Sequence, residues 1–317
     1  MLKEKFFLPH NFLGIPKEYS QYQSSKFLIL PIPYEQTTSF IKGTKDGPKA
    51  IIDASKQVEF YDEETGFEPY REGIYTFPEL EPQALSPQAM VQRIYQVAKK
   101  ICGEFSPNIS NKEKILISLG GEHTITIGLV KAFKKEYRNL SVLQLDAHAD
   151  LRDSYQESKY SHACVMRRIH QFCPYVSVGI RSISLEEKRF TQRNKIKIFM
   201  AQGMKDNKSW MEQVIGLLSD EVYLTLDLDF LDPSIMPAVG TPEPGGFLWD
   251  ETLDFLKRLS LKRKIIGWDI VELCPLPGNV FPDFLAAKLI YKLMGYILRR
   301  EEERFHGTKK GSKKKRE

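Results

Sequence analysis

The chain has 317 residues, 42% of them hydrophobic and 27% charged, which is the composition of an ordinary soluble globular protein. Its formal net charge is +5. Six of the 46 basic side chains but only one of the 41 acidic ones lie in residues 306–317, which leaves 40 of each sign in residues 1–305. The body of the protein therefore has no excess charge that would attract nucleic acid or an anionic membrane surface.

The cysteine pattern and the hydropathy pattern both point to the cytoplasm. Four cysteines are scattered without CxxC spacing, so neither a zinc knuckle nor a disulfide framework is indicated. The N-terminal MLKEKFFLPHNFLGIP lacks the continuous apolar stretch of a signal peptide. No apolar run approaches the roughly 20 residues that cross a bilayer. We expect a cytoplasmic protein without a membrane segment.

Along the chain, short apolar runs alternate with longer stretches in which apolar residues recur with the period of an α-helix. Several runs are apolar throughout, which is typical of strands covered on both faces. Residues 90–101 and 285–297 each place apolar side chains on one helical face. The alternation predicts a mostly parallel sheet sandwiched between helices. The expected strands are Phe27–Ile32, Ile115–Leu119, Val142–Leu145, Tyr175–Gly179, Val222–Leu228 and Ile265–Ile270.

The domain organisation is predicted to be simple. No internal repeat and no linker rich in Pro, Gly or Ser divides the chain, so residues 1–305 are expected to form a single domain. The ending GTKKGSKKKRE is strongly charged and poor in apolar residues. Residues 306–317 are therefore expected to be a disordered, solvated tail rather than an RNA-binding or membrane-binding arm.

The densest cluster of chemically active side chains is the run Asp146-Ala147-His148-Ala149-Asp150, directly after the strand expected at 142–145. Side chains at positions i, i+2 and i+4 of an extended segment point the same way. Two carboxylates and an imidazole would then converge on one space, which is costly unless a cation neutralises them. A plain polar strand exit with a helix-capping Asp is the alternative, and we favour the metal.

Two further segments carry the same types of side chain at expected strand ends. Asp227 and Asp229 share a face about 7 Å apart along the backbone, although a single DxD is a weak signal because turns often carry Asp. His123 follows two glycines that permit a tight turn. Open α/β sheets bind ligands at the carboxyl ends of their strands. Together the segments predict a site for two divalent ions, and their oxygen-rich donors with some imidazole favour Mn²⁺.

These segments, in this order, resemble the ureohydrolase family of arginases and agmatinases. The matching motifs are GGEHT, DAHAD, SHA around His162, TLDLDFLDP, GTPEPGG and DIVEL around Glu272. They extend over roughly residues 43–297, and several ordered motifs are far more specific than one DxD. GTKDGPKAI, VGIRS and YSHACVMRR resemble the agmatinase branch. The resemblance implies a three-layer αβα sandwich with a central, mostly parallel sheet of about eight strands, and a homotrimer or homohexamer.

The resemblance also implies two Mn²⁺ ions per chain, with Asp146 and Asp227 bridging them. The ligands of one ion would be His123, Asp146, Asp150 and Asp227. The ligands of the other would be Asp146, His148, Asp227 and Asp229. His162 matches a histidine that shuttles protons, and Glu272 matches a glutamate that holds the guanidinium of the substrate.

The mechanism expected on this basis is urea release. Paired ions lower the pKa of a shared water, and the hydroxide attacks the guanidinium carbon. Asp150 would accept a hydrogen bond from that hydroxide, Glu272 would orient the guanidinium, and His162 would protonate the leaving amine. The products would be urea and an amine.

The substrate remains open among small cationic guanidino compounds. Leu151-Arg152-Asp153 replaces the Asn/Thr-containing loop with which arginases bind an amino acid, which argues against arginine. Asp153 and Glu157 would bind a distal cation, whereas Arg152 and Lys159 would attract an acid such as guanidinobutyrate. Agmatine, giving putrescine and urea, is the first choice. N(1)-aminopropylagmatine, giving spermidine, is the second.

Three other classes of protein fit the sequence less well. A metal-dependent phosphoesterase also uses paired ions, but the GNH-type motif of such enzymes is missing. A deacetylase relative of the same fold would use one Zn²⁺ and fewer acidic ligands. A non-catalytic interaction protein with a working basic tail is the third alternative, and the complete ligand set argues against it.

Overall fold

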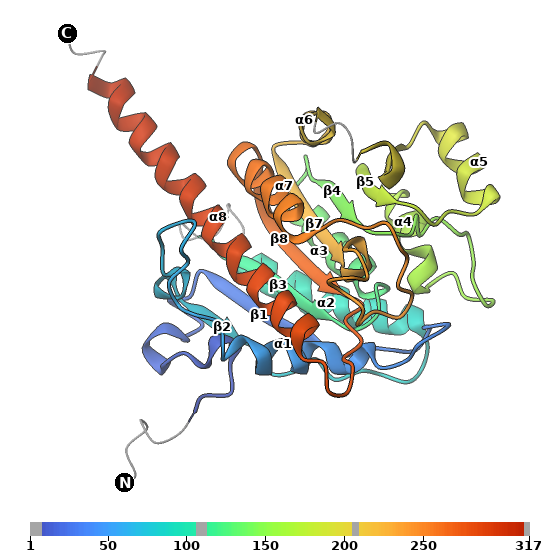
Figure 1. Ribbon diagram of the computed structural model, residues 1–317, viewed down its shortest axis with the longest axis horizontal. Coiled ribbons are helices and arrows are strands. Elements are labelled where there is room, and N and C mark those ends of the chain that lie inside the picture. Colours follow the sequence, from blue (N-terminus) through green and yellow to red (C-terminus); the bar gives the residue numbers. More distant parts are fainter. Residues whose placement is uncertain (1–7, 106–112, 205–208, 314–317) are drawn as a thin grey trace.

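The computed structural model describes residues 8–105, 113–204 and 209–313, with side chains up to residue 303. Within these segments the chain forms one sheet of eight strands in the order β2-β1-β3-β8-β7-β4-β5-β6 (Figure 1). Every neighbouring pair runs parallel. The strands are β1 (Phe27–Ile32), β2 (Ile74–Thr76), β3 (Ile115–Gly120), β4 (Ser141–Leu145), β5 (Tyr175–Ile180), β6 (Lys197–Met200), β7 (Glu221–Asp227) and β8 (Lys264–Val271).

The six strands predicted from the sequence are all present, within one residue of the expected ends. Their residues are almost all buried, as expected for strands that are covered on both faces. The prediction missed β2 and β6, which have three and four residues and form the two edges of the sheet. Edge strands bury fewer side chains, so they lack the apolar run by which a central strand is recognised.

Helices cover both faces of the sheet, so the predicted three-layer sandwich is confirmed. Side chains alternate along each strand: Phe27 and Ile29 of β1 belong to one hydrophobic cluster, and Leu28 and Leu30 belong to the other. The first cluster contains residues of α1 (Gly47–Ser55), α6 (Ser209–Leu217), α7 (Trp249–Lys262) and α8 (Phe281–Lys313). The second contains residues of α2 (Pro87–Glu104), α3 (Ile125–Glu136), α4 (Val165–Ile169) and α5 (Leu185–Asn194).

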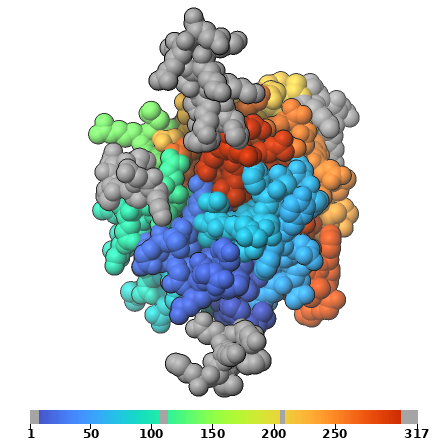
Figure 2. Space-filling view, turned by 90° about the vertical axis from the view of Figure 1, so that its left-hand side faces the viewer, coloured from blue at the N-terminus to red at the C-terminus, as the bar shows by residue number. Residues whose placement is uncertain are grey.

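The C-terminal helix is longer than the sequence predicted. Disorder was expected from residue 306, but α8 continues to Lys313, and residues 314–317 lie outside the described part. The first half of α8 is anchored, because the buried Lys292 Nζ lies 2.9 Å from Asp62 Oδ2 and 3.0 Å from Glu63 Oε1. In Figure 2 the red residues of α8 lie beside the light-blue loop that supplies these carboxylates. Extending an established helix through lysines, which are good helix formers, costs little.

Five adjacent strands, β1, β3, β8, β7 and β4, end at the same edge of the sheet. The register aligns Leu145 with Leu226 and Asp227 with Val271, so the residues that follow β4, β7 and β8 are neighbours in space. The carboxyl edge of a parallel sheet is where open α/β proteins bind ligands. Among the residues that the structure describes, no helix combines the length and hydropathy needed to cross a membrane.

Candidate metal centre

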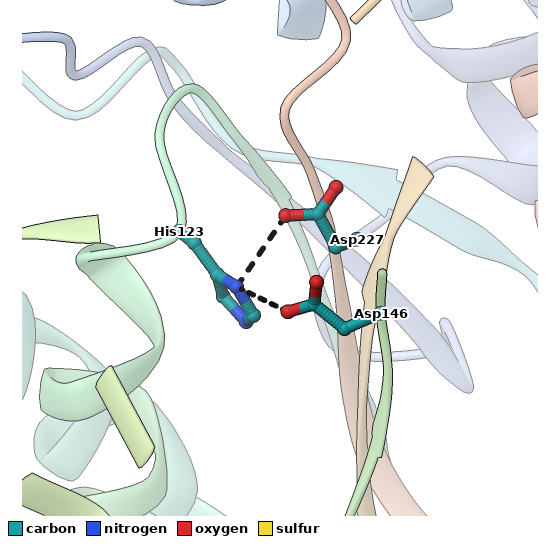
Figure 3. A group of neighbouring side chains, drawn as sticks. All are labelled: His123, Asp146 and Asp227. Carbon is teal, nitrogen blue, oxygen red and sulfur yellow. Dashed lines mark ion pairs between the residues drawn. The ribbon is translucent and has the colours of Figure 1, made fainter. Parts of the chain in front are cut away.

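One imidazole is surrounded by three carboxylates at the carboxyl edge of the sheet. His123 Nδ1 lies 3.0 Å from Asp150 Oδ2, 3.2 Å from Asp146 Oδ2 and 3.4 Å from Asp227 Oδ2. All four side chains are buried. Figure 3 shows His123 pointing from the loop after β3 toward Asp146 and Asp227, which stand at the ends of β4 and β7.

The turn after β3 explains why His123 reaches this position. A Cβ on Gly121 would lie 2.1 Å from the carbonyl oxygen of Tyr34, so only glycine lets the chain pass so close to the end of β1. The next backbone amide, that of Glu122, donates to the same carbonyl at 2.8 Å. The amide of His123 donates to Glu272 Oε1 at 2.6 Å, which ties the turn to the end of β8.

A hydrogen-bond chain through Thr225 and Asp269 determines which ring nitrogen of His123 carries the proton. Its Nε2 lies 2.8 Å from Thr225 Oγ1, and Thr225 donates to Asp269 Oδ1 at 2.6 Å. Asp269 is fully buried and also accepts from the hydroxyls of Thr126 and Tyr223. Because the hydrogen of Thr225 is committed to Asp269, its oxygen must accept from Nε2–H. The neutral ring therefore carries its proton on Nε2 and a lone pair on Nδ1.

Within the part of the chain that the structure describes, this buried Nδ1 has no hydrogen-bond partner, which fits a divalent metal ion. Burial lowers the pKa of His123, but the facing carboxylates of Asp146, Asp150 and Asp227 raise it well above its usual value. A divalent cation among these carboxylates would compete with a proton for Nδ1, so metal binding is expected to depend on pH. An imidazole nitrogen with three carboxylates is a donor set for a borderline-hard divalent ion.

A second group of ligand-type atoms adjoins the first and shares Asp146 with it. His148 Nδ1 lies 2.8 Å from Asp229 Oδ2 and 3.8 Å from Asp146 Oδ1. One donor atom each from Asp146, His148 and Asp229 lies within 4.8 Å of the others. Burial and the charges of Asp150 and Asp229 raise the pKa of Asp146 to about 7. Carboxylates packed so closely repel one another, and a cation between them relieves that repulsion.

Two residues of the site have a backbone conformation that L-amino acids rarely adopt. Asp150 has φ 51° and Glu272 has φ 66°. Neither is a glycine, so each stores backbone strain that the surrounding structure must hold in place. Strain of this kind is concentrated at functional sites, where it directs a side chain that a relaxed backbone would turn elsewhere.

A cavity of about 230 Å³ opens over the two groups. His162 and Glu272 line it, together with rim residues that include Phe40, Arg152 and Tyr155. Burial raises the pKa of Glu272 to about 8, and nearby Glu122 adds to that shift. A guanidinium ion beside Glu272 would restore the ionised form. The structure thus brings His162 and Glu272 together with all six predicted metal ligands.

Asp153, which the sequence suggested as a substrate-binding residue, is placed differently. Its Oδ1 accepts from Arg168 Nη2 at 2.6 Å and lies 3.5 Å from Arg167 Nε. It is not among the residues that line the cavity. The structure therefore does not bring Asp153 to the substrate side of the site.

Sequence reasoning missed several residues that support the centre. Asp269 and Thr225 orient His123, and the signal for Asp269 was a carboxylate inside the otherwise apolar run of β8. Arg181 was noted only as part of VGIRS. Its guanidinium donates to the backbone carbonyls of Asp229 and Glu243, which fixes the loop after β7. No local sequence pattern predicts these hydrogen bonds of Arg181, because the acceptors are backbone oxygens of residues distant in sequence.

The fold and the paired ligand groups define a hydrolase of the ureohydrolase class. A sequence model of the Arginase family matches residues 25–295, and the chain belongs to that family. It is an agmatinase-like ureohydrolase, an enzyme that hydrolyses a guanidino group. The resemblance inferred from the motifs is thereby confirmed.

Individual relatives match over most of their length. The N(1)-aminopropylagmatine ureohydrolase of Synechocystis sp. is 40% identical over 302 residues, which cover 91% of this chain and 96% of that protein. The agmatinase of Pyrococcus horikoshii is 31% identical over 278 residues, which cover 87% and 94%. The crystal structure of agmatine ureohydrolase of Thermoplasma volcanium superposes with a TM-score of 0.83 at 30% identity, covering 94% of this chain and 98% of that one.

Proposed function

We propose that this enzyme hydrolyses N(1)-aminopropylagmatine to urea and spermidine, and that agmatine is its second substrate. The observation that carries the reaction is His123 Nδ1 facing three buried carboxylates beside a cavity that Glu272 lines. The choice of substrate is supported by the relative from Synechocystis sp., which is 40% identical over nearly the whole chain. Agmatine, the first choice from the sequence, is supported by the fold match to the agmatine ureohydrolase of Thermoplasma volcanium.

The position of each side chain supports a specific role in the reaction. A pair of divalent ions, when bound, supplies a hydroxide nucleophile near neutral pH. His123, Asp146, Asp150 and Asp227 would hold one ion, and His148 and Asp229 would complete the second group with the shared Asp146 and Asp227. We propose Mn²⁺ for both positions, because the donors are mainly oxygen with some imidazole.

Glu272 would bind and orient the guanidinium. Its side chain lines the cavity, and its Oε1 already accepts from the amide of His123, which fixes the carboxylate next to the metal ligands. A carboxylate and a guanidinium form a charge-assisted pair with two parallel hydrogen bonds. Such a pair would hold the guanidinium carbon over the centre in one orientation.

His162 would carry a proton to the leaving amine. It lines the cavity, and burial lowers its pKa, so that its protonated ring gives up the proton readily. Asp150, close to the same cavity, would accept a hydrogen bond from the nucleophile. An amine leaves the tetrahedral intermediate only when it is protonated, so a proton carrier at the cavity is required.

The same cavity bears on the alternative substrates. A phosphate ester would bring its negative charge next to Glu272, a carboxylate that lines the cavity and is not among the proposed metal ligands. With its guanidinium at Glu272, guanidinobutyrate would direct its carboxylate toward the rim, where Arg152 would attract it. We further propose a homotrimeric or homohexameric enzyme of the cytoplasm, which needs no nucleic acid or membrane partner.

The test is urea release by the Mn²⁺-loaded enzyme with four substrates: N(1)-aminopropylagmatine, agmatine, arginine and guanidinobutyrate. We expect the highest kcat/KM for N(1)-aminopropylagmatine, a lower value for agmatine and no measurable urea from arginine. A higher kcat/KM for agmatine would reverse the order of the two substrates. Absence of urea from all four, with two metal ions bound per chain, would overturn the proposal.

A further inference from the structure

The residue before the metal ligand His123 makes an unusual set of contacts. Glu122 is fully buried, and four donors point at its carboxylate. The backbone amides of Gln36 and Thr37 donate to Oε2 at 2.7 and 2.6 Å. The hydroxyls of Thr37 and Thr124 donate to Oε1 at 2.7 and 2.6 Å. A carboxylate is only an acceptor, so the hydroxyl hydrogen of Thr37 is committed to Glu122.

The oxygen of Thr37 also contacts His162, which lines the cavity. Thr37 Oγ1 lies 3.2 Å from His162 Nδ1, and it accepts from the backbone amide of His162 at 3.2 Å. Because its own hydrogen is directed to Glu122, Oγ1 can only accept from the ring as well. Nδ1 must therefore carry a hydrogen. Ser161 Oγ lies farther away, at 3.4 Å, and its hydroxyl can turn to suit either form of the ring.

The other ring nitrogen of His162, Nε2, is available for proton transfer. Among the polar atoms of the described residues, Ser39 Oγ lies 3.5 Å from Nε2, and the ring lines the cavity. A ring with its hydrogen held on Nδ1 takes up and releases its second proton at Nε2. With the opposite tautomer, Nε2 would already be protonated in the neutral ring and the lone pair would face Thr37.

We propose that Glu122 and Thr37 are positioning residues, which act through a two-step relay to hold the proton of neutral His162 on Nδ1 and keep Nε2 open to the leaving amine. The inference rests on the proposed function, in which His162 protonates that amine. It adds a role for the loop after β1: the strand end that carries Thr37 is part of the proton-transfer apparatus, although it holds no metal ligand.

The first experiment removes and then restores the hydroxyl, using urea release by the Mn²⁺-loaded enzyme. Thr37→Val keeps the shape of the side chain but cannot accept from Nδ1. We expect kcat to fall by about tenfold or more, a fraction of the roughly 10²–10⁴ that a general acid contributes, while KM changes by less than about threefold. Thr37→Ser should recover kcat to within about threefold of the wild type. A normal kcat in Thr37→Val would overturn the relay.

A double-mutant cycle separates positioning from a merely structural effect. In a His162→Ala background, Thr37→Val should change kcat by less than about twofold, because the group it positions is gone. An undiminished effect in that background would contradict the relay. Thr252→Val is the matched control: Thr252 is buried in α7, and its hydroxyl donates to the carbonyl of Leu248, remote from the cavity. It should leave kcat unchanged.

Glu122→Gln tests the direction of the hydrogen bonds with almost no change in volume. Its amide oxygen can still accept from the two backbone amides, but its NH₂ group must donate to the hydroxyls of Thr37 and Thr124. The hydrogen of Thr37 would then turn to Nδ1 and reverse the relay. We expect a fall in kcat similar to that of Thr37→Val, with two metal ions still bound per chain. Wild-type kcat in this variant would overturn the proposal.

The outcomes also separate this inference from the proposed function. If His162→Ala retains full kcat, the proton-carrying role itself fails. If His162→Ala is impaired while Thr37→Val and Glu122→Gln are normal, only the relay fails. If Ser161→Ala lowers kcat and Thr37→Val does not, the neighbouring serine holds the ring instead, and the relay is likewise wrong.

Discussion

The metal half and the substrate half of the site are built differently. The proposed metal ligands stand at or just after the ends of the central strands β3, β4 and β7, and the buried Asp269 of β8, the strand between β3 and β7, supports His123 through Thr225. The substrate half is made of loops, in which Phe40 is 72% exposed and Arg152 and Tyr155 form the rim. Strand ends in a packed sheet fix an atom closely, whereas loops vary. We infer that the reaction resides in the strands and the choice of amine in the loops.

The largest expected effect comes from removing a strand-borne metal ligand. His148→Ala or Asp227→Ala should lower kcat for urea release by at least about 10³-fold, since each loses several kcal/mol of transition-state stabilisation that the ions provide. Metal content measured on the same samples should fall from two ions to one or none. Undiminished activity in either variant would refute the assignment of the centre and, with it, the contrast between strands and loops.

The next largest effect is expected at Glu272, where the two halves meet. Glu272→Gln keeps the hydrogen bond with the amide of His123 but loses the charge that faces a guanidinium. A charge-assisted hydrogen bond contributes about 1.5–3 kcal/mol, so kcat/KM should fall by roughly 10–100-fold. Metal content should remain normal. An unchanged kcat/KM would remove Glu272 from the substrate site.

A smaller effect is expected behind the metal ligands. Thr225→Val removes the acceptor for His123 Nε2–H, so the ring loses its orientation, and affinity for Mn²⁺ should fall by about 10–100-fold. Thr126→Val is the matched control, because its hydroxyl also donates to Asp269 but does not contact His123. Metal titration of both variants measures the difference. Equal losses would show that general packing, not the hydrogen bond to the ring, determines affinity.

The smallest effect is expected at Asp153, in the loop that forms the rim. Asp153→Asn should change KM for either polyamine substrate by less than about threefold, because its carboxylate is half-exposed and already paired with Arg168. Exposed pairs of this kind contribute at most about 1 kcal/mol to stability. A tenfold rise in KM for one substrate only would restore Asp153 to the substrate site and give the loop a direct role in recognition.

The sequence predicted the strand-borne half well and the rest poorly, for physical reasons. Asp146, His148 and Asp150 were recognisable because polar side chains in a two-residue period directly after an apolar run need a cation. Each edge strand was missed because three or four half-exposed residues carry no such period. Thr37 and Glu122 gave no signal, since their hydrogen bonds join residues 85 positions apart. The helical extension of α8 was missed because composition alone ignores the anchored turns before it.

The position of β8 in the sheet has a consequence for how the enzyme is made. β8 is the last strand in the chain, yet it lies in the middle, between β3 and β7. While residues 264–271 are still inside the ribosome, the earlier strands can form two separate half-sheets, one bearing His123 and the other bearing the aspartates. A pocket that combines His123 with the aspartates therefore requires β8 to be in place, because this last strand joins the two half-sheets.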